Sequence, residues 1–159
     1  MITGGETSVP PRTRRVPGEF LLGAAPIGAA LLVAFNDFWL KPRYPGVMSG
    51  KLSDVGLCFF FPLLVAAAAE WMLWPVAALA KSVLAIPRPK LYAASCWFSA
   101  AYFTFIKLFD GGARMHVELL STLFPGHSFR AVADPTDLLC LPLVWLAHRY
   151  LVRSLTSAD

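Results

Sequence analysis

The run VGLCFFFPLLVAAAAEWMLW, residues 55–74, decides the fold class of this chain. It contains one charged side chain, Glu70, and one interruption, Pro62. A helix that crosses a bilayer needs about 20 consecutive, mainly apolar residues. The run therefore predicts a transmembrane helix.

Three further apolar runs lie at residues 20–40, 91–109 and 136–152. Between the second and third runs, prolines 87 and 89 accompany Lys81 and Arg88. This stretch predicts the central connection, because proline lacks a backbone donor and disfavours helix in the residue before it. We therefore expect an all-α polytopic membrane protein with four transmembrane helices in two antiparallel hairpins. Residues 20–152 would form this single domain, residues 1–19 a basic cytoplasmic tail and residues 153–159 a short cytoplasmic tail.

Composition agrees with lipid as the solvent. Of 159 residues, 57% are hydrophobic and 15% charged, against roughly 45–50% and roughly 25% in soluble domains. The net charge of +4 comes from short basic groups between apolar runs, without the basic stripe of a nucleic-acid-binding protein. The lipid bilayer is thus the expected partner and nucleic acid is not. A protein partner or a homo-oligomer stays open.

Basic residues in the loops predict the orientation, because cytoplasmic loops carry the excess of lysine and arginine. Eight lie on one side: Arg12, Arg14, Arg15, Lys81, Arg88, Lys90, Arg149 and Arg153. Five lie on the other: Lys41, Arg43, Lys51, Arg114 and Arg130, or six with Lys107. We expect a multi-pass protein of the bacterial inner (cell) membrane with both termini cytoplasmic. The alternative interpretation of the first apolar run is a cleaved twin-arginine export signal that begins at Arg14-Arg15. Against it, no good small-x-small cleavage site follows before Lys41.

Polar residues gather at one end of the predicted bundle. The candidate binding cluster consists of Asp37, Lys51, Asp54, Lys107, Asp110, Asp134 and Asp137. All belong to span ends on the predicted outer face, with Asn36, Ser53 and Thr136 beside them. Glu70, near the inner end of the second span, is the exception. The two hairpins also resemble each other, since each second span opens on Ser53-Asp54 or Thr136-Asp137, a pattern seen in membrane proteins built from repeats.

The strings Gly50-Lys51-Leu52-Ser53-Asp54 and Asp134-Pro135-Thr136-Asp137-Leu138 resemble motifs of a family of small multi-pass bacterial membrane proteins without an assigned activity. The resemblance covers these two short windows. It implies a membrane location and no activity.

Helix capping is the structural interpretation of the cluster. Asp134-Pro135-Thr136-Asp137 is a good helix start. It has an N-cap acid, proline at the first helical position and a second acid at the third position, where its charge interacts favourably with the helix dipole. Four carboxylates also have a lysine or arginine three or four residues away, which predicts local ion pairs. These pairs are Asp37 with Lys41, Asp54 with Lys51, Asp110 with Lys107, and Asp134 with Arg130. Asp137 has no such partner.

The functional interpretation starts from the cost of ionisable groups in a membrane, which are usually found facing a bundle interior or cavity. Converging span ends would place Asp54, Asp137 and Lys107 around one polar pocket. Residues 113–124 predict a short amphipathic interfacial helix, with His116 on its apolar side. No organic cofactor is expected. The sequence offers one candidate site for a divalent cation, with Asp54, Asp137 and His127 as ligands.

Two enzyme classes match only in part. Two short stretches resemble motifs of type 2 lipid phosphatases: Lys81 with Arg88-Pro89, and Pro125-Gly126-His127. The predicted topology places Lys81 and His127 on opposite faces of the membrane, whereas phosphoryl catalysis needs them at one site. Membrane thiol oxidoreductases need a reactive cysteine pair, whereas Cys58, Cys96 and Cys140 each lie in apolar runs and are expected to pack as small core residues. The leading expectation is a non-enzymatic ion- or solute-handling or accessory membrane component, and the alternative is a membrane-embedded metal-dependent hydrolase.

Overall fold

The structure, a computed structural model, describes residues 16–44, 46–79, 87–126 and 129–156. Within these ranges all regular structure is helical, as expected. The elements are η1 (Glu19–Leu22), α1 (Ala24–Phe35), the π-helix η2 (Asn36–Leu40), α2 (Lys41–Arg43), α3 (Val47–Leu79), α4 (Arg88–Leu108), α5 (Asp110–Leu123), η3 (Pro135–Cys140) and α6 (Pro142–Thr156).

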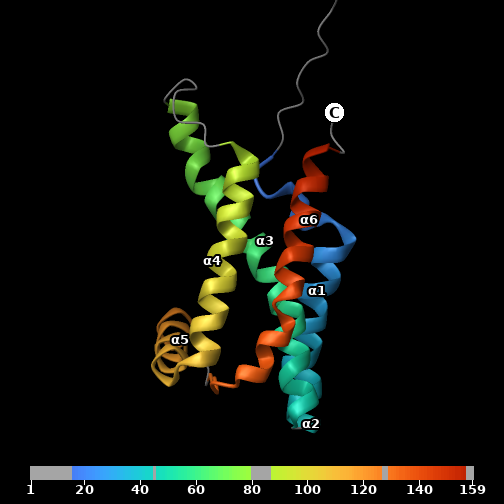
Figure 1. The fold of residues 1–159 in the computed structure, drawn as a ribbon, viewed down its shortest axis with the longest axis vertical. Coiled ribbons are helices and arrows are strands. Elements are labelled where there is room, and N and C mark those ends of the chain that lie inside the picture. Colours follow the sequence, from blue (N-terminus) through green and yellow to red (C-terminus); the bar gives the residue numbers. More distant parts are fainter. Residues whose placement is uncertain (1–15, 45, 80–86, 127–128, 157–159) are drawn as a thin grey trace, which may run out of the picture.

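Helix α3 is the centre of the bundle and packs against α1, α4 and α6 (Figure 1). These four helices alternate in direction, whereas α5 lies crosswise at the end where α2 and η3 also lie (Figure 1). We call this the α5 end. The first described residues and the C-terminal end of α6 lie at the opposite end, which we call the terminal end (Figure 1).

Two helical stretches are long and apolar enough to cross a membrane, where four were expected. They are Ser49–Pro75, within α3, and Pro135–Thr156, formed by η3 and α6. The α-helical part of α1 has only 12 residues before the π-helical turns begin. Helix α4 has 21 residues but carries Arg88, Lys90 and several hydroxyl groups, which lower its hydropathy.

Most helix ends differ from the sequence-based bounds, and prolines are involved in α3 and α4. Helix α3 begins at Val47, before the expected start at residue 55, and continues through both Pro62 and Pro75. Helix α4 begins at Arg88, with Pro89 in its first turn. Proline is tolerated there because the first backbone N–H groups of a helix have no intrahelical partner. Helices α3 and α4 therefore extend further towards each other along the chain than the prolines predicted.

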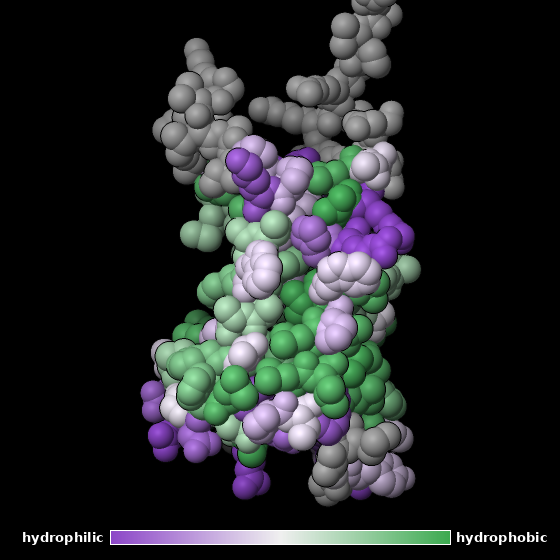
Figure 2. All heavy atoms as spheres, viewed as in Figure 1, coloured by the Kyte–Doolittle hydropathy of each residue, from purple (hydrophilic) through white to green (hydrophobic). Residues whose placement is uncertain are grey.

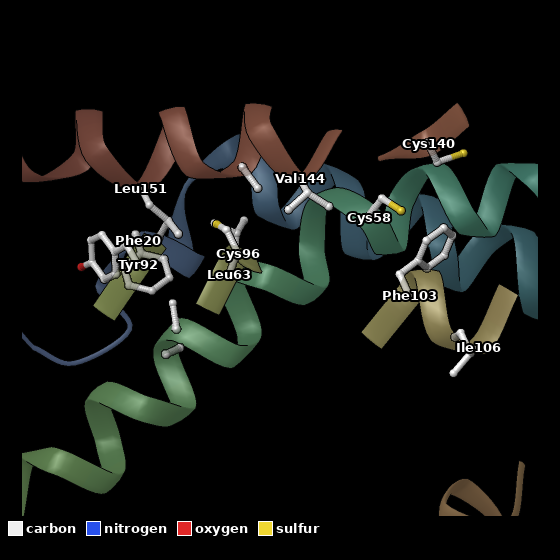
Figure 3. Close-up of a cluster of buried hydrophobic side chains, with 13 residues drawn as sticks. Phe20, Cys58, Leu63, Tyr92, Cys96, Phe103, Ile106, Cys140, Val144 and Leu151 are labelled. Atoms are coloured by element: carbon white, nitrogen blue, oxygen red, sulfur yellow. The ribbon is translucent and has the colours of Figure 1, made fainter. Parts of the chain in front are cut away.

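The bundle interior is a continuous apolar core that runs along its axis (Figure 3). Phe20, Leu63 and Tyr92 lie towards one end of it, and Phe103 and Ile106 towards the other (Figure 3). The three cysteines are free and buried in or beside this core, which confirms their expected role as packing residues: Cys58, Cys96 and Cys140.

The outer surface is apolar over the middle of the bundle. Figure 2 shows a broad hydrophobic belt with hydrophilic surface above and below it. Exposed large side chains come from every long helix, including Leu31, Met72, Trp97 and Trp145. Helix α5 adds Met115, Leu119 and Leu123, which recur every fourth residue and are all exposed. The predicted amphipathic helix is thus present, and part of its apolar stripe has no covering element among the described residues.

Helices α1 and α3 come close together at Gly56. A Cβ there would lie 2.5 Å from Val33 Cγ2 and 3.2 Å from the Ala29 carbonyl oxygen. Glycine allows this contact, which aligns the end of α1 with the first turns of α3. It brings Asn36 and Ser53 into hydrogen-bond distance at the α5 end.

Candidate functional site

The polar residues of the α5 end come from three converging elements. The early turns of α3 carry Lys51 and Asp54, the last turn of α4 carries Lys107, and η3 carries Asp137. Because α3 begins before residue 51, Lys51 and Asp54 lie one turn apart inside a helix rather than at its cap. Both can therefore point towards neighbouring helices.

Four charged side chains form a chain of ion pairs that we call the ion-pair ladder: Lys51, Asp54, Lys107 and Asp137. Lys107 Nζ donates to Asp54 Oδ2 at 2.9 Å and to Asp137 Oδ2 at 2.6 Å. Lys51 Nζ donates to the other oxygen of Asp137, Oδ1, at 2.9 Å. The ladder thus joins three elements that are far apart in sequence.

The ladder is largely shielded from solvent at its centre. The side chains of Asp54, Lys107 and Asp137 are 11%, 15% and 8% exposed, whereas Lys51 is about one third exposed. Two ammonium groups balance two carboxylates, so the ladder carries no formal net charge. Buried charges need such pairing because desolvation of each ion costs several kcal/mol.

Asp134 and Thr136 extend the ladder towards solvent. Lys51 Nζ donates to Thr136 Oγ1 at 2.6 Å and lies 3.9 Å from Asp134. Asp134 is the N-cap of η3 and accepts from the backbone N–H of Thr136 at 2.9 Å, as the sequence predicted. Hydrogen bonds from the Thr136 hydroxyl and N–H lower the pKa of the Asp134 carboxyl.

Only one of the four predicted local ion pairs forms, namely Asp37 with Lys41 at 2.6 Å. Asp54 pairs with Lys107 instead of Lys51, and Lys51 contacts Asp134 in place of Arg130. These two predictions, and that of Asp110 with Lys107, were wrong because the lysines reach carboxylates on other elements. Asp110 is exposed and forms no ion pair with a described residue.

A second polar group lies beside the ladder, at the π-helical turns of η2. Ser53 Oγ donates to Asp37 Oδ1 at 2.6 Å, and Asn36 Nδ2 donates to the Ser49 carbonyl oxygen at 2.6 Å and to Ser53 Oγ. Asn36 is fully buried, and its Oδ1 has no partner among the described residues. Asn36 was expected beside the candidate cluster and not as one of its binding residues, although an amide at the end of an apolar run was a signal for it.

Glu70 organises the terminal end of the bundle. Its Oε2 accepts from the Gly18 N–H at 2.8 Å, and its Oε1 accepts from the Tyr92 hydroxyl at 2.8 Å and forms an ion pair with Arg88 Nε at 3.1 Å. The side chain is 6% exposed. Glu70 therefore ties the N-terminal segment, α3 and α4 together, a role that the sequence analysis did not assign.

The predicted metal site is not supported by the described residues. Among them no group of three His, Cys, Asp and Glu side chains could hold a metal ion. Asp54 and Asp137 are brought together, but Lys107 lies between them. His127 lies outside the described residues. His116 is on α5, where its Nδ1 lies 2.7 Å from the Tyr102 hydroxyl.

Comparison of the chain with protein-family models, with curated proteins and with solved structures finds no match to any of them.

Proposed function

We propose that this chain is a four-span integral membrane protein that handles a small cation or proton at the ion-pair ladder. The exposed apolar belt supports lipid as its solvent, and the antiparallel order of α1, α3, α4 and α6 supports four crossings with both chain ends on one side. The count of loop lysines and arginines in the sequence, eight on one predicted side against five or six on the other, supports a cytoplasmic placement of both ends.

The observation that carries the proposal is Lys107, an ammonium group shared by two buried carboxylates. Ionisable residues within membrane helices are costly and commonly mark ion or proton pathways. Asp137 has two lysine partners, whereas Asp54 has Lys107 alone. The bond between Lys107 and Asp54 can therefore open while Asp137 keeps a cationic partner. A proton or monovalent cation that binds Asp54 would replace Lys107 there, and its release would restore the ladder.

A flux assay tests this function. The purified protein would be placed in liposomes with a pH-sensitive dye inside, under proton, sodium or potassium gradients. We expect a flux that Asp54→Asn lowers at least about tenfold. Asp110→Asn is the matched control, because Asp110 is an exposed carboxylate at the same end without an ion pair to a described residue. Absence of any flux, or equal flux in Asp54→Asn, would overturn the proposal.

Topology is tested separately. In a variant with the native cysteines replaced by alanine, single cysteines at Ser121 on α5 and at Thr156 on α6 should react with an impermeant reagent from opposite sides of the membrane. We expect Ser121→Cys to react from outside the cell and Thr156→Cys only after permeabilisation. A cysteine at position 82 labelled from outside would contradict both termini being cytoplasmic.

A further inference from the structure

A cavity of about 450 Å³ lies at the terminal end of the bundle, remote from the ion-pair ladder. Its walls come from the N-terminal segment, α3, α4 and α6. Among the described residues, its charged lining consists of two acids, Glu19 and Glu70, and two bases, Arg88 and Arg153. Phe20, Tyr92 and Tyr150 also line it, so charged groups surround aromatic surface.

Hydrogen bonds between different elements hold the cavity walls together. The Tyr150 hydroxyl donates to the Phe20 carbonyl oxygen at 2.9 Å, and the Tyr92 hydroxyl donates to Glu70. A Cβ at Gly23 would collide with the Tyr150 hydroxyl. The space is therefore built by specific contacts between elements far apart in sequence.

The cavity lies at the depth where lipid head groups would be found around this protein. Arg88 is the first residue of α4, and Arg153 lies near the end of α6. On α3, Trp71 and Trp74 are exposed near Glu70, and tryptophan is enriched at membrane interfaces. Figure 2 shows hydrophilic surface at this end where the apolar belt stops.

The charges of the lining indicate the class of ligand. Glu70 is already satisfied by Gly18, Tyr92 and Arg88. The Arg88 guanidinium uses Nε for that contact, and its remaining N–H groups suit phosphate oxygens. Arg153 adds a second positive charge and Glu19 a negative one, so the part of the lining that the structure describes is neutral and contains both signs. A ligand of matching chemistry carries a phosphate and an ammonium group.

We propose that this cavity binds the head group of a zwitterionic phospholipid, with the phosphate towards Arg88 and Arg153 and the ammonium towards Glu19. The acyl chains would leave the cavity along the exposed apolar belt. The proposal is independent of ion handling at the ladder, because no residue is shared between the two sites.

The test is ligand-dependent thermal stability of the full chain in detergent. The probes are dihexanoyl phosphatidylcholine, dihexanoyl phosphatidylglycerol of equal chain length and the soluble head group phosphocholine. For the wild type we expect the zwitterionic lipid to bind at least about fivefold more tightly than the anionic lipid, and phosphocholine to have little effect. If phosphocholine stabilises the protein as much as the zwitterionic lipid does, the ligand is a soluble molecule and the proposal of a lipid ligand is overturned.

Three variants assign the charges. Arg153→Gln should weaken binding of both lipids about tenfold, because a charge-assisted hydrogen bond to phosphate is lost. Glu19→Gln should abolish or reverse the preference for the zwitterionic lipid. Arg149→Gln is the matched control, since Arg149 lies one turn before Arg153 but stacks over Trp145 instead of lining the cavity. Unchanged lipid preference in Glu19→Gln, or equal losses in Arg149→Gln and Arg153→Gln, would overturn the proposal.

Discussion

The ammonium of Lys107 lies 2.6 Å from Asp137 Oδ2, although the two residues are 30 positions apart in sequence. The same ammonium lies 2.9 Å from Asp54 Oδ2 on α3. One side chain thus connects α4 with α3 and with η3. It fixes the register of three elements at the α5 end, because each carboxylate must reach the same nitrogen atom.

Loss of Lys107 should destabilise the fold strongly. Lys107→Met leaves Asp54 without its lysine and removes one of the two from Asp137. Removal of one partner from a buried pair typically costs about 3–5 kcal/mol, so we expect about 3 kcal/mol for this site near a helix end. Chemical unfolding in detergent measures it. Lys41→Met is the control, since its pair with Asp37 is about 40% exposed and should cost under about 1 kcal/mol. Equal losses in both variants would contradict a special role for Lys107.

Asp54 and Asp137 should behave as one unit. Asp54→Asn and Asp137→Asn each leave Lys107 with one carboxylate, whereas the double variant leaves it with none. The free-energy changes of unfolding should therefore not add, with an interaction of about 0.5–3 kcal/mol, as is usual for residues in one network. The measurement is unfolding of the two single variants and the double variant. Additivity within about 0.5 kcal/mol would indicate that the two carboxylates act independently.

The helices were predictable from the sequence, but their polar contacts were not. The apolar runs overlap α1, α3, α4 and α6, but most helix ends differ from the predicted ends by three to eight residues. The start of α3 was missed because Ser53 and Asp54 are good cap residues, and nothing local reveals that the helix begins earlier. The run at residues 55–74 was expected to end at Trp74, although α3 continues through Pro75 to Leu79.

The ladder illustrates why pairing needs the fold. Lysine and aspartate one turn apart satisfy a local rule, so the sequence favoured Lys51 with Asp54 and Lys107 with Asp110. The structure pairs both lysines with Asp137 because helix register brings that carboxylate between them. The lack of a local partner for Asp137 was the one sequence signal that pointed to this arrangement.

Glu70 should anchor the N-terminal segment to the bundle. Glu70→Gln keeps an acceptor for Gly18 or Tyr92 but removes the charge opposite Arg88, which is about one third exposed. We expect the free energy of unfolding to fall by about 1–3 kcal/mol, since a charged interaction is removed from a buried site. Limited proteolysis near residues 16–23 should become faster as the free energy of unfolding falls. The double variant Glu70→Gln with Arg88→Gln should recover part of the stability, and no recovery would argue against the ion pair as the cause.

His116 should make the stability of the protein sensitive to acid. Burial, and then the positive charge of Lys107, lower the pKa of His116 below its ordinary value of 6.5. The folded state therefore binds fewer protons than the unfolded state between the folded pKa and about 6.5. Stability from this group is fully present above the unfolded pKa and is lost as the pH falls through the folded pKa.

The measurement is the free energy of unfolding in detergent between pH 7.5 and 4.5, for the wild type and for His116→Gln. Glutamine keeps a polar partner for the Tyr102 hydroxyl, which lies 2.7 Å from His116 Nδ1, but does not titrate. The difference between the two curves isolates the histidine, because the carboxylates titrate in both proteins. We expect the wild type to lose more stability on acidification than the variant. A difference that stays constant with pH, or that favours the wild type at low pH, would show that protonation of His116 does not oppose folding.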